Sequence, residues 1–302
     1  MNASVQAEMN QGTIAETIAE TIGEYAANFH HENIPAEVRE QARYIMADGL
    51  GIAFASTGFD FAKTAYAALS GQEDGATGSV IGLAGPLPMR DAVMLNAMLV
   101  HGLDYDDTYL AGGVHPTSSC VATALGVAEN LDRSGADLLT AYVLGMEVLT
   151  RVAAIAQGSL NQCGLHPSSM LAGFGAAVTT GWLMRLNANQ MTMAQGIALG
   201  AAGGTLESLV DGSWTKRMQP GWAAASGITA ARLARQGFVG ARAGGQVRRV
   251  CRPHGRARVG VRFLHRHAWP GRDLEHPAGG AQTLPGLPCR AGGDPGGADH
   301  LA

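Results

Sequence analysis

Residues 101–119 read HGLDYDDTYLAGGVHPTSS, a stretch that places three carboxylates, two imidazoles and several hydroxyls close together in the chain. Long segments with apolar residues at helical spacing flank it on both sides. Because the whole chain is 46% hydrophobic and only 15% charged, such a dense polar segment is unusual for it. The pattern predicts a helical domain with a functional site in the connection between two of its helices.

The sequence on either side of this stretch favours helices. Apolar residues recur every three to four positions in segments 13–29, 35–50, 89–103, 116–131, 136–156, 170–185, 192–202 and 221–236. Pro35 and Pro116 suit a first helical turn, and Gly237 suits the position after a helix. Residues 77–83 are the one strand expected, too short to organise a sheet. We therefore expect a flexible N-terminus over residues 1–12 and an all-α domain of about eight to ten helices over residues 13–238.

The cysteines and the apolar runs argue against a zinc protein, a disulfide-rich protein and a membrane protein. The four cysteines are scattered without a CxxC pair, which argues against a zinc site or a disulfide framework. No basic segment followed by an apolar core marks a signal peptide, and the apolar runs fall short of the roughly 20 residues that span a bilayer. We expect a soluble cytoplasmic protein without a membrane partner. Without a glycine-rich phosphate loop or a GxSxG motif, nucleotide-dependent chemistry has no support.

The aspartates of residues 104–107 follow a helix, where the helix dipole disfavours a negative charge. Three explanations for this placement remain open. His101, the aspartates and His115 could bind Mn²⁺, Fe²⁺ or Mg²⁺. The same groups could serve acid-base catalysis, or they could form a structural network of hydrogen bonds that caps the next helix.

Two histidines share a local pattern. His115 lies in Val-His-Pro-Thr-Ser-Ser and His166 in Leu-His-Pro-Ser-Ser-Met. In each case the proline opens a helix and leaves the imidazole at its N-terminus, a position that attracts anions such as a carboxylate. A single His-Pro pair is usually structural, but its repetition favours a functional role.

Lys216 is one of only two lysines in the chain, the other being Lys63. It lies in Trp-Thr-Lys-Arg, just before Gln219-Pro220-Gly221 at the expected start of a helix. This position suits the binding of a carboxylate or acid-base work. The alternative is a solvated pair of cations, Lys216 and Arg217, on the surface.

Taken together, HGLDYDDT, the following His-Pro, the second His-Pro-Ser-Ser and TKRMQPGWAAASG resemble the MmgE/PrpD family over residues 13–238. This family includes 2-methylcitrate dehydratase, cis-aconitate decarboxylase and iminodisuccinate epimerase. The resemblance implies a helical first domain, a smaller α/β second domain and frequent homodimers. It also implies chemistry on small polycarboxylates without a metal or another cofactor.

The resemblance also assigns roles to individual residues. Members break a bond next to a carboxylate, so a histidine would act as acid or base, the lysine would hold the developing negative charge, and the aspartate would orient or tune a histidine. The implied catalytic residues are Asp104, His115, His166 and Lys216. The implied substrate-binding residues are Thr108, Arg217 and Gln219. Gln219 stands where many members have a histidine, which leaves the role of that position open.

The function expected from this resemblance is that of a metal-independent lyase, with 2-methylcitrate dehydratase as the first candidate. A decarboxylase or an epimerase of the same family is the alternative. Outside the family's chemistry, the chain could be a catalytically inactive helical module that serves dimerisation.

Residues 239–302 differ from the rest of the chain. They contain ten arginines, four acidic residues and no lysine, and they are rich in glycine and proline. Codons read one base later can encode Glu-Gly-Arg-Phe-Gly from residue 244 and Lys-Pro-Tyr-Pro-Ala-Cys-His from residue 282, both resembling second-domain motifs of the family. We therefore expect a non-native, disordered tail produced by a frameshift near residues 239–243, and little turnover by this chain. An arginine-rich nucleic-acid-binding tail would need more aromatic residues than Phe263 and Trp269.

Overall fold

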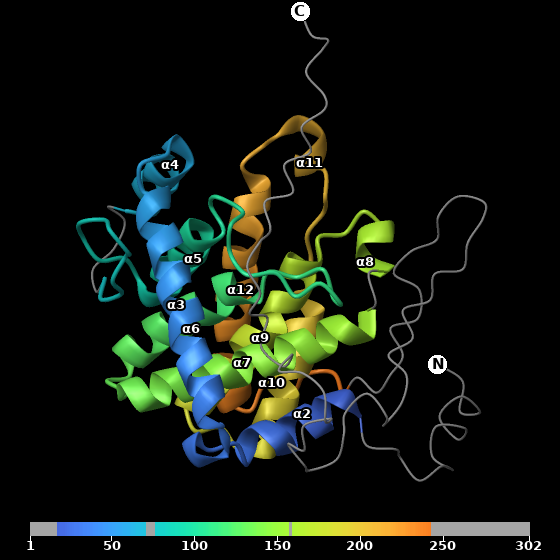
Figure 1. Ribbon diagram of the computed structural model, residues 1–302. Helices are drawn as coiled ribbons and strands as arrows, with labels where there is room; N and C mark the ends of the chain where they lie inside the picture. Colours follow the sequence, from blue (N-terminus) through green and yellow to red (C-terminus); the bar gives the residue numbers. More distant parts are fainter. Residues whose placement is uncertain (1–16, 71–75, 157–158, 243–302) are drawn as a thin grey trace, which may run out of the picture.

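A computed structural model describes residues 17–70, 76–156 and 159–242, and this part of the chain is helical without a β-strand (Figure 1). The helices are α2 (Ile18–Ala27), η1 (His31–Asn33), α3 (Ala36–Ser56), α4 (Asp60–Leu69), α5 (Met89–Val100), α6 (Pro116–Asn130), α7 (Gly135–Ala156), α8 (Ser159–Gln162), α9 (Pro167–Leu183), α10 (Ala188–Gly200), α11 (Ser208–Asp211) and α12 (Thr215–Arg235). The predicted all-α fold is confirmed for these residues. Helix α4 and the short helices η1, α8 and α11 were not predicted.

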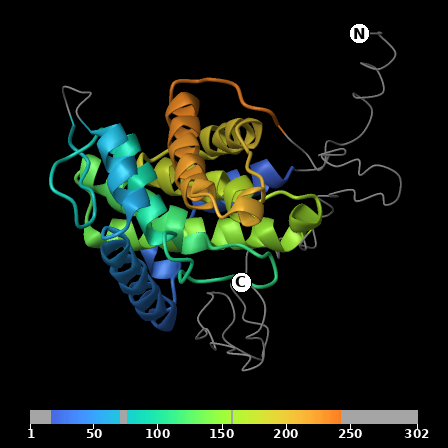
Figure 2. The same ribbon diagram turned by 90° about the horizontal axis from the view of Figure 1, so that it is seen from above.

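Helix α9 forms the centre of the domain. Nearly all of its side chains are buried, and α6, α7, α10 and α12 pack around it (Figures 1 and 2). Helix α7 is long and apolar enough to cross a membrane, but 72% of its most apolar window is buried inside the fold. Burial on this scale is typical of a core helix in a globular domain.

Small residues let α12 approach its neighbours closely. A Cβ atom on Gly227 would lie 2.6 Å from the Ala176 Cβ and 2.6 Å from the Gly173 carbonyl oxygen, both on α9. A Cβ atom on Gly221 would clash with the Met94 carbonyl oxygen on α5. Gly227 therefore lets α12 pack closely on α9, and Gly221 brings the N-terminal half of α12, which carries Lys216, against α5.

Helix α12 begins six residues earlier than the sequence pattern predicts. Pro220 lies inside the helix rather than before it, although a proline there removes one helical hydrogen bond. Pro220 and Gln219 are both buried, so packing of this turn outweighs the lost bond. At the other end, the prediction for Gly237 agrees with the structure: the helix ends at Arg235 and Gly237 has a φ of 87°.

The strand expected over residues 77–83 is replaced by a single antiparallel bridge between Gly78 and Leu87. A side chain takes the place of a neighbouring strand. The Asn96 amide on α5 accepts from the Ile81 backbone N–H at 2.9 Å and donates to the Ser79 carbonyl at 2.9 Å. Since these polar backbone atoms already have partners, the segment packs against α5 without forming a sheet.

The expected N-terminal segment, residues 1–12, lies outside the described residues, and so does the predicted tail from residue 243 onward. Residues 239–242, the start of the predicted tail, are described. Gly240 lies against α10, because a Cβ atom there would clash with the Met193 carbonyl oxygen. The described part of the chain therefore extends slightly past the predicted domain boundary at residue 238.

Candidate active site

Four helix ends meet at one side of the domain. Helix α5 ends just before His101, α6 begins after His115, α9 begins after His166, and α12 carries Lys216 in its first turn. The rings of His101 and His115 lie 5.0 Å apart between centroids, and those of His101 and His166 lie 5.9 Å apart. Three imidazoles that are separated in the sequence are thus neighbours in space.

The two His-Pro motifs form matching helix starts, as predicted. His115 and His166 are the N-cap residues of α6 and α9, and a proline occupies the first turn of each helix. The His115 backbone N–H donates to the Ser168 Oγ at 2.9 Å, which joins the two helix starts directly. The positive ends of two long helix dipoles therefore lie side by side, an arrangement that favours an anion.

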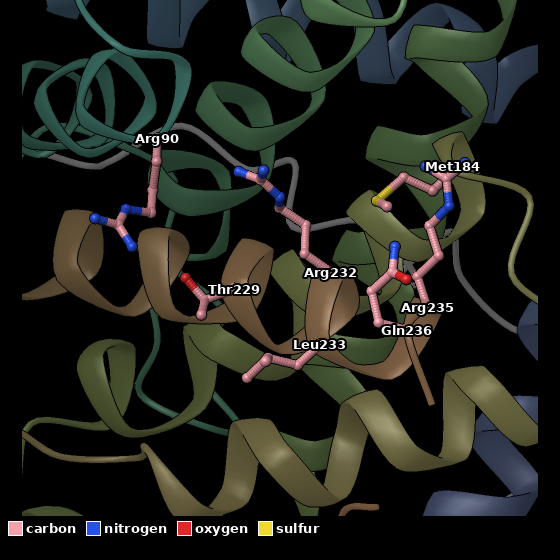
Figure 3. A pocket seen from close by; sticks show the side chains of 7 residues that line it. All are labelled: Arg90, Met184, Thr229, Arg232, Leu233, Arg235 and Gln236. Atoms are coloured by element: carbon pink, nitrogen blue, oxygen red, sulfur yellow. The ribbon is translucent and has the colours of Figure 1, made fainter. Parts of the chain in front are cut away.

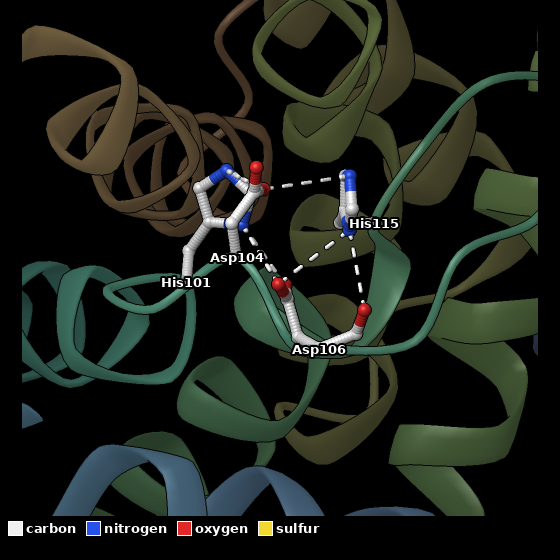
Figure 4. A group of neighbouring side chains, drawn as sticks. All are labelled: His101, Asp104, Asp106 and His115. Carbon is white, nitrogen blue, oxygen red and sulfur yellow. Dashed lines mark hydrogen bonds and ion pairs between the residues drawn. The ribbon is translucent and has the colours of Figure 1, made fainter. Parts of the chain in front are cut away.

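The turn after α5 depends on Asp104, whose φ of 59° is in the left-handed region. Aspartate tolerates this conformation better than most residues with a side chain. The turn directs the chain back, so that Asp106 comes to lie beside His101 and His115 (Figure 4). A strained residue of this kind is often found at a functional site.

Asp106 contacts both imidazoles from beneath (Figure 4). Its carboxylate oxygens each lie 3.0 Å from the His101 Nδ1, and the His115 Nδ1 lies 3.3 Å from its backbone oxygen and 3.5 Å from Oδ1. Burial alone would raise the pKa of Asp106, but the charge of His101 and hydrogen bonds from both histidines hold the pKa well below its usual range. Asp106 is therefore a buried anion between two imidazoles.

Asp104 joins these histidines to Lys216. Its Oδ2 accepts from the Lys216 Nζ at 2.6 Å, and its Oδ1 lies 3.9 Å from the His101 Nε2 and 3.8 Å from the His115 Nε2. Partial burial opposes ionisation of Asp104, but the hydrogen bond from Lys216 and the nearby histidines keep its pKa below the ordinary value. The ammonium group and the aspartate come from segments more than one hundred residues apart.

The environments of His115 and His166 shift their pKa values in opposite directions. Burial lowers the pKa of His115, but the hydrogen bond to Asp106 and the charges of Asp106 and Asp104 outweigh burial and raise it. Burial and the charge of His101 lower the pKa of His166 to about 4, against a hydrogen bond with Gln219 that acts in the other direction. At neutral pH His166 is therefore a neutral imidazole, and His115 is the more easily protonated of the two.

The three residues predicted to bind substrate have other partners in this structure. The Gln219 Oε1 lies 2.6 Å from the His166 Nδ1, and its Nε2 donates to the Thr205 carbonyl at 3.0 Å. The Arg217 Nε donates to the Gly102 carbonyl at 2.7 Å. The Thr108 Oγ1 lies 3.4 Å from the His115 Nδ1. Gln219 and Thr108 thus contact the histidines, whereas Arg217 ties α12 to the end of α5.

Sequence comparison gives this geometry a context. A family model described as the MmgE/PrpD N-terminal domain matches residues 20–244. The chain belongs to the MmgE/PrpD family. This confirms the resemblance on which the residue assignments were based.

Similar proteins include cis-aconitate decarboxylases and a protein described as cis-aconitate decarboxylase-like. An enzyme of this name from Aspergillus terreus is 29% identical over 228 residues, which is 73% of this chain and 46% of the relative. A cis-aconitate decarboxylase-like protein of Aspergillus oryzae is 29% identical over 69% of this chain and 45% of the relative. The human cis-aconitate decarboxylase is 31% identical over 51% of this chain and 32% of its own length. The chain thus spans about half the length, or less, of the curated relatives that it matches.

Four side chains of this MmgE/PrpD chain are arranged as the ligands of a metal ion could be. Possible ligand atoms of His101, Asp104, Asp106 and His115 lie within 4.8 Å of one another. The donor set would fit a divalent cation. However, the Lys216 ammonium group is hydrogen-bonded to Asp104, and a second positive charge at this carboxylate would be repelled. The charges present therefore favour an anionic ligand near Lys216.

A hollow of about 420 Å³ lies elsewhere, at the C-terminal end of α12 (Figure 3). It is lined by Arg90, Met184, Thr229, Arg232, Leu233, Arg235 and Gln236. None of the predicted site residues lines it. Arg232 and Arg235 lie in the last turn of α12, where cations stabilise the end of a helix, so a structural role accounts for them.

His101 and Asp106 were expected to take part in a metal site, in acid-base catalysis or in a structural network, and neither belonged to the catalytic set that the family resemblance implied. Both side chains are completely buried and hydrogen-bonded to each other. Their five-residue separation carries no helical or strand periodicity that would predict this contact. The sequence does contain one signal for this pair, a histidine at a helix end followed closely by aspartates. A carboxylate beside such a histidine frequently orients the imidazole.

Asp107 gives the site a testable dependence on pH. Burial and the neighbouring charge of Asp106 raise the pKa of Asp107 to about 7, although the Thr117 backbone N–H donates to its Oδ1 at 3.1 Å. Its Oδ2 is buried without a hydrogen-bond partner. The native state therefore holds a proton that the unfolded state releases above pH 4, and wild-type stability falls as the pH rises from about 4 to 7.

We expect Asp107→Asn to remove the loss of stability between pH 4 and pH 7. Relative to wild type, the free energy of unfolding of the variant should be similar at pH 4 and higher at pH 8 by on the order of 4 kcal/mol. Urea unfolding at both pH values measures the difference. Asp137→Asn is the control with the opposite sign, because slight burial of Asp137 is outweighed by hydrogen bonds from Ser134 and an ion pair with Arg185, which lower its pKa. An equal effect of Asp107→Asn at both pH values would contradict the raised pKa.

Proposed function

We propose that this chain forms the helical part of the active site of a lyase that acts on a small polycarboxylate. One observation carries the proposal: close to the Lys216 ammonium group, the pKa of His115 is raised and the pKa of His166 is lowered. His166 is kept neutral and His115 is made easier to protonate, and such a pair assigns a base and an acid within one site.

The roles follow from position. Lys216 and the starts of α6 and α9 would hold carboxylates of the substrate, because these are the positive groups of the site. His166 would accept a proton from the carbon next to a carboxylate, and His115 would donate one. Asp104 would keep Lys216 in place in the free enzyme. A carboxylate of the substrate would then replace Asp104 as the partner of the Lys216 ammonium group.

Decarboxylation of a compound such as cis-aconitate is the first candidate reaction. In such a reaction the bond from carbon to the leaving carboxylate breaks, the carboxylate leaves as carbon dioxide, the electron pair stays on the carbon skeleton, and the carbon that holds this pair takes a proton from His115. The names of the relatives support this choice.

Dehydration of 2-methylcitrate, the reaction expected from the sequence, remains the second candidate. There His166 would remove a proton from carbon, and hydroxide would leave as water with a proton from His115. His115 would donate a proton in both reactions, whereas His166 would act as the base in the dehydration. Homodimer formation, a cytoplasmic location and a frameshifted tail also remain predictions.

An assay with cis-aconitate, 2-methylcitrate and iminodisuccinate tests the proposal. We would compare this chain with a version whose second reading frame is restored from residue 243, and follow carbon dioxide release, loss of water and epimerisation. We expect turnover of one substrate by the restored chain and a fall of about 10²- to 10⁴-fold in His115→Asn and His166→Asn. Absence of turnover in every case would favour an inert helical module.

A further inference from the structure

We infer that Asp106 is a positioning residue that holds His101 and His115 in one tautomer, with the proton on Nδ1, so that both bare Nε2 atoms face the same point beside Asp104. This deepens the function proposed above, because it concerns the same site. Its test does not require turnover, so either proposal can fail without the other.

The contacts of His101 carry the first step. Its Nδ1 lies 3.0 Å from both oxygens of the buried Asp106 carboxylate. An ionised carboxylate only accepts hydrogen bonds, and a bare ring nitrogen at this distance would be repelled by it. The His101 Nδ1 must therefore carry a proton, so Nε2 is the bare nitrogen whenever the ring is neutral.

The same argument applies to His115. Its Nδ1 lies 3.3 Å from the Asp106 backbone oxygen and 3.5 Å from the Asp106 Oδ1. Both atoms are acceptors, so Nδ1 is again the protonated nitrogen. The Thr108 Oγ1, 3.4 Å away, can donate or accept and does not decide the tautomer by itself.

With the proton on Nδ1, the Nε2 atoms of His101 and His115 are the nitrogens left to accept a proton. The His101 Nε2 is completely buried and has no hydrogen-bond partner. It faces the Asp104 Oδ1 at 3.9 Å, and the His115 Nε2 faces the same oxygen at 3.8 Å (Figure 4). Either bare Nε2 can take a proton, and the neighbouring Asp104 carboxylate would stabilise the positive charge that results. Asp106 thus directs the proton-accepting nitrogens of two imidazoles toward Asp104.

The remaining charged groups around His115 act on the same proton. Asp104 and Asp106 attract it, and so does Asp107 when ionised, whereas the positive charge of Lys216 and of a protonated His101 or His166 repels it. Because Lys216 already holds the Asp104 Oδ2 at 2.6 Å, only Oδ1 is left to face the histidines. If Asp106 did not position the rings, its replacement would leave the tautomers of His101 and His115 unchanged.

Nuclear magnetic resonance of the intact chain with ¹⁵N-labelled histidine tests the inference. Spectra that correlate ring carbon-bound protons with both ring nitrogens identify the tautomer, and His101→Asn and His115→Asn assign the two signals. At alkaline pH we expect both rings to carry the proton on Nδ1. In Asp106→Asn we expect a mixture of tautomers for His101 and a fall of about 1 unit or more in the titration midpoint of His115.

Asp107→Asn is the matched control, because Asp107 is the next residue but its carboxyl group accepts from the Thr117 backbone instead of contacting the two Nδ1 atoms. It should preserve both tautomers. Proton occupancy of Nε2 alone in either wild-type ring overturns the inference, as does a folded Asp106→Asn chain with unchanged tautomers and an unchanged His115 midpoint. If Asp106→Asn does not fold, the His115 tautomer is compared between wild type and Thr108→Val. An unchanged tautomer in Thr108→Val supports Asp106 as the positioning residue, whereas a changed tautomer assigns that role to Thr108.

Discussion

Replacing Lys216 by methionine is expected to weaken the binding of a polycarboxylate by about 10- to 100-fold, since a hydrogen bond to a charged partner contributes about 1.5–3 kcal/mol. In a chain that turns over its substrate, kcat/KM should fall by about 10²- to 10³-fold, the usual effect of losing a group that stabilises developing negative charge. Methionine keeps most of the length of lysine and removes only its charge. Titration calorimetry with cis-aconitate measures the binding loss.

Lys63 provides the matched control, because it is the other lysine of the chain and is exposed on α4 beside Asp60. Lys63→Met should bind like wild type. The double variant Asp104→Asn/Lys216→Met separates two explanations of the loss. If Lys216 only neutralises Asp104, the double variant should bind as well as wild type, and this outcome would contradict direct contact between Lys216 and the ligand. Asparagine tolerates the left-handed conformation of residue 104, so the turn should be preserved.

Local features of the site could be predicted from sequence because short-range chemistry determines them. A proline after His115 and after His166 fixes a helix start, and the ring of each histidine must then lie at the helix N-terminus. The all-α fold follows in the same way from apolar spacing. These features require no knowledge of how distant segments pack.

The rest depends on packing between segments that no local pattern describes. The partners of Asp106 follow from the left-handed turn at Asp104, and the family resemblance, rather than residue spacing, linked Lys216 to that turn. The position of Gln219 could not be predicted because α12 was expected to start after Pro220. Once Pro220 lies within the helix, Gln219 is buried and faces His166. A residue assigned to the substrate thereby becomes the partner of a histidine.

Replacing Gln219 by glutamate should therefore change the protonation of His166. In the native site the Gln219 Nε2 donates to the Thr205 carbonyl, so its Oε1 faces the His166 Nδ1. A carboxylate in this position adds a negative charge beside the ring, which raises the pKa of His166 from about 4 by about 1–3 units. The titration of the His166 ring, followed by nuclear magnetic resonance, measures this shift.

The consequence for stability has a definite sign. In wild type the pKa of His166 is lower in the folded state than in the unfolded state, so the unfolded chain binds more protons between about pH 6.5 and 4 and stability falls as the pH is lowered through this window. The Gln219→Glu variant should reduce this acid-induced loss, although the lost bond to Thr205 lowers stability at every pH. Gln219→Met is the control, because it removes both hydrogen bonds without adding charge and should leave the pKa low. An equal His166 midpoint in the glutamate and methionine variants would show that the side chain at position 219 does not control this imidazole, and His166 would lose its place as the tuned base of the site.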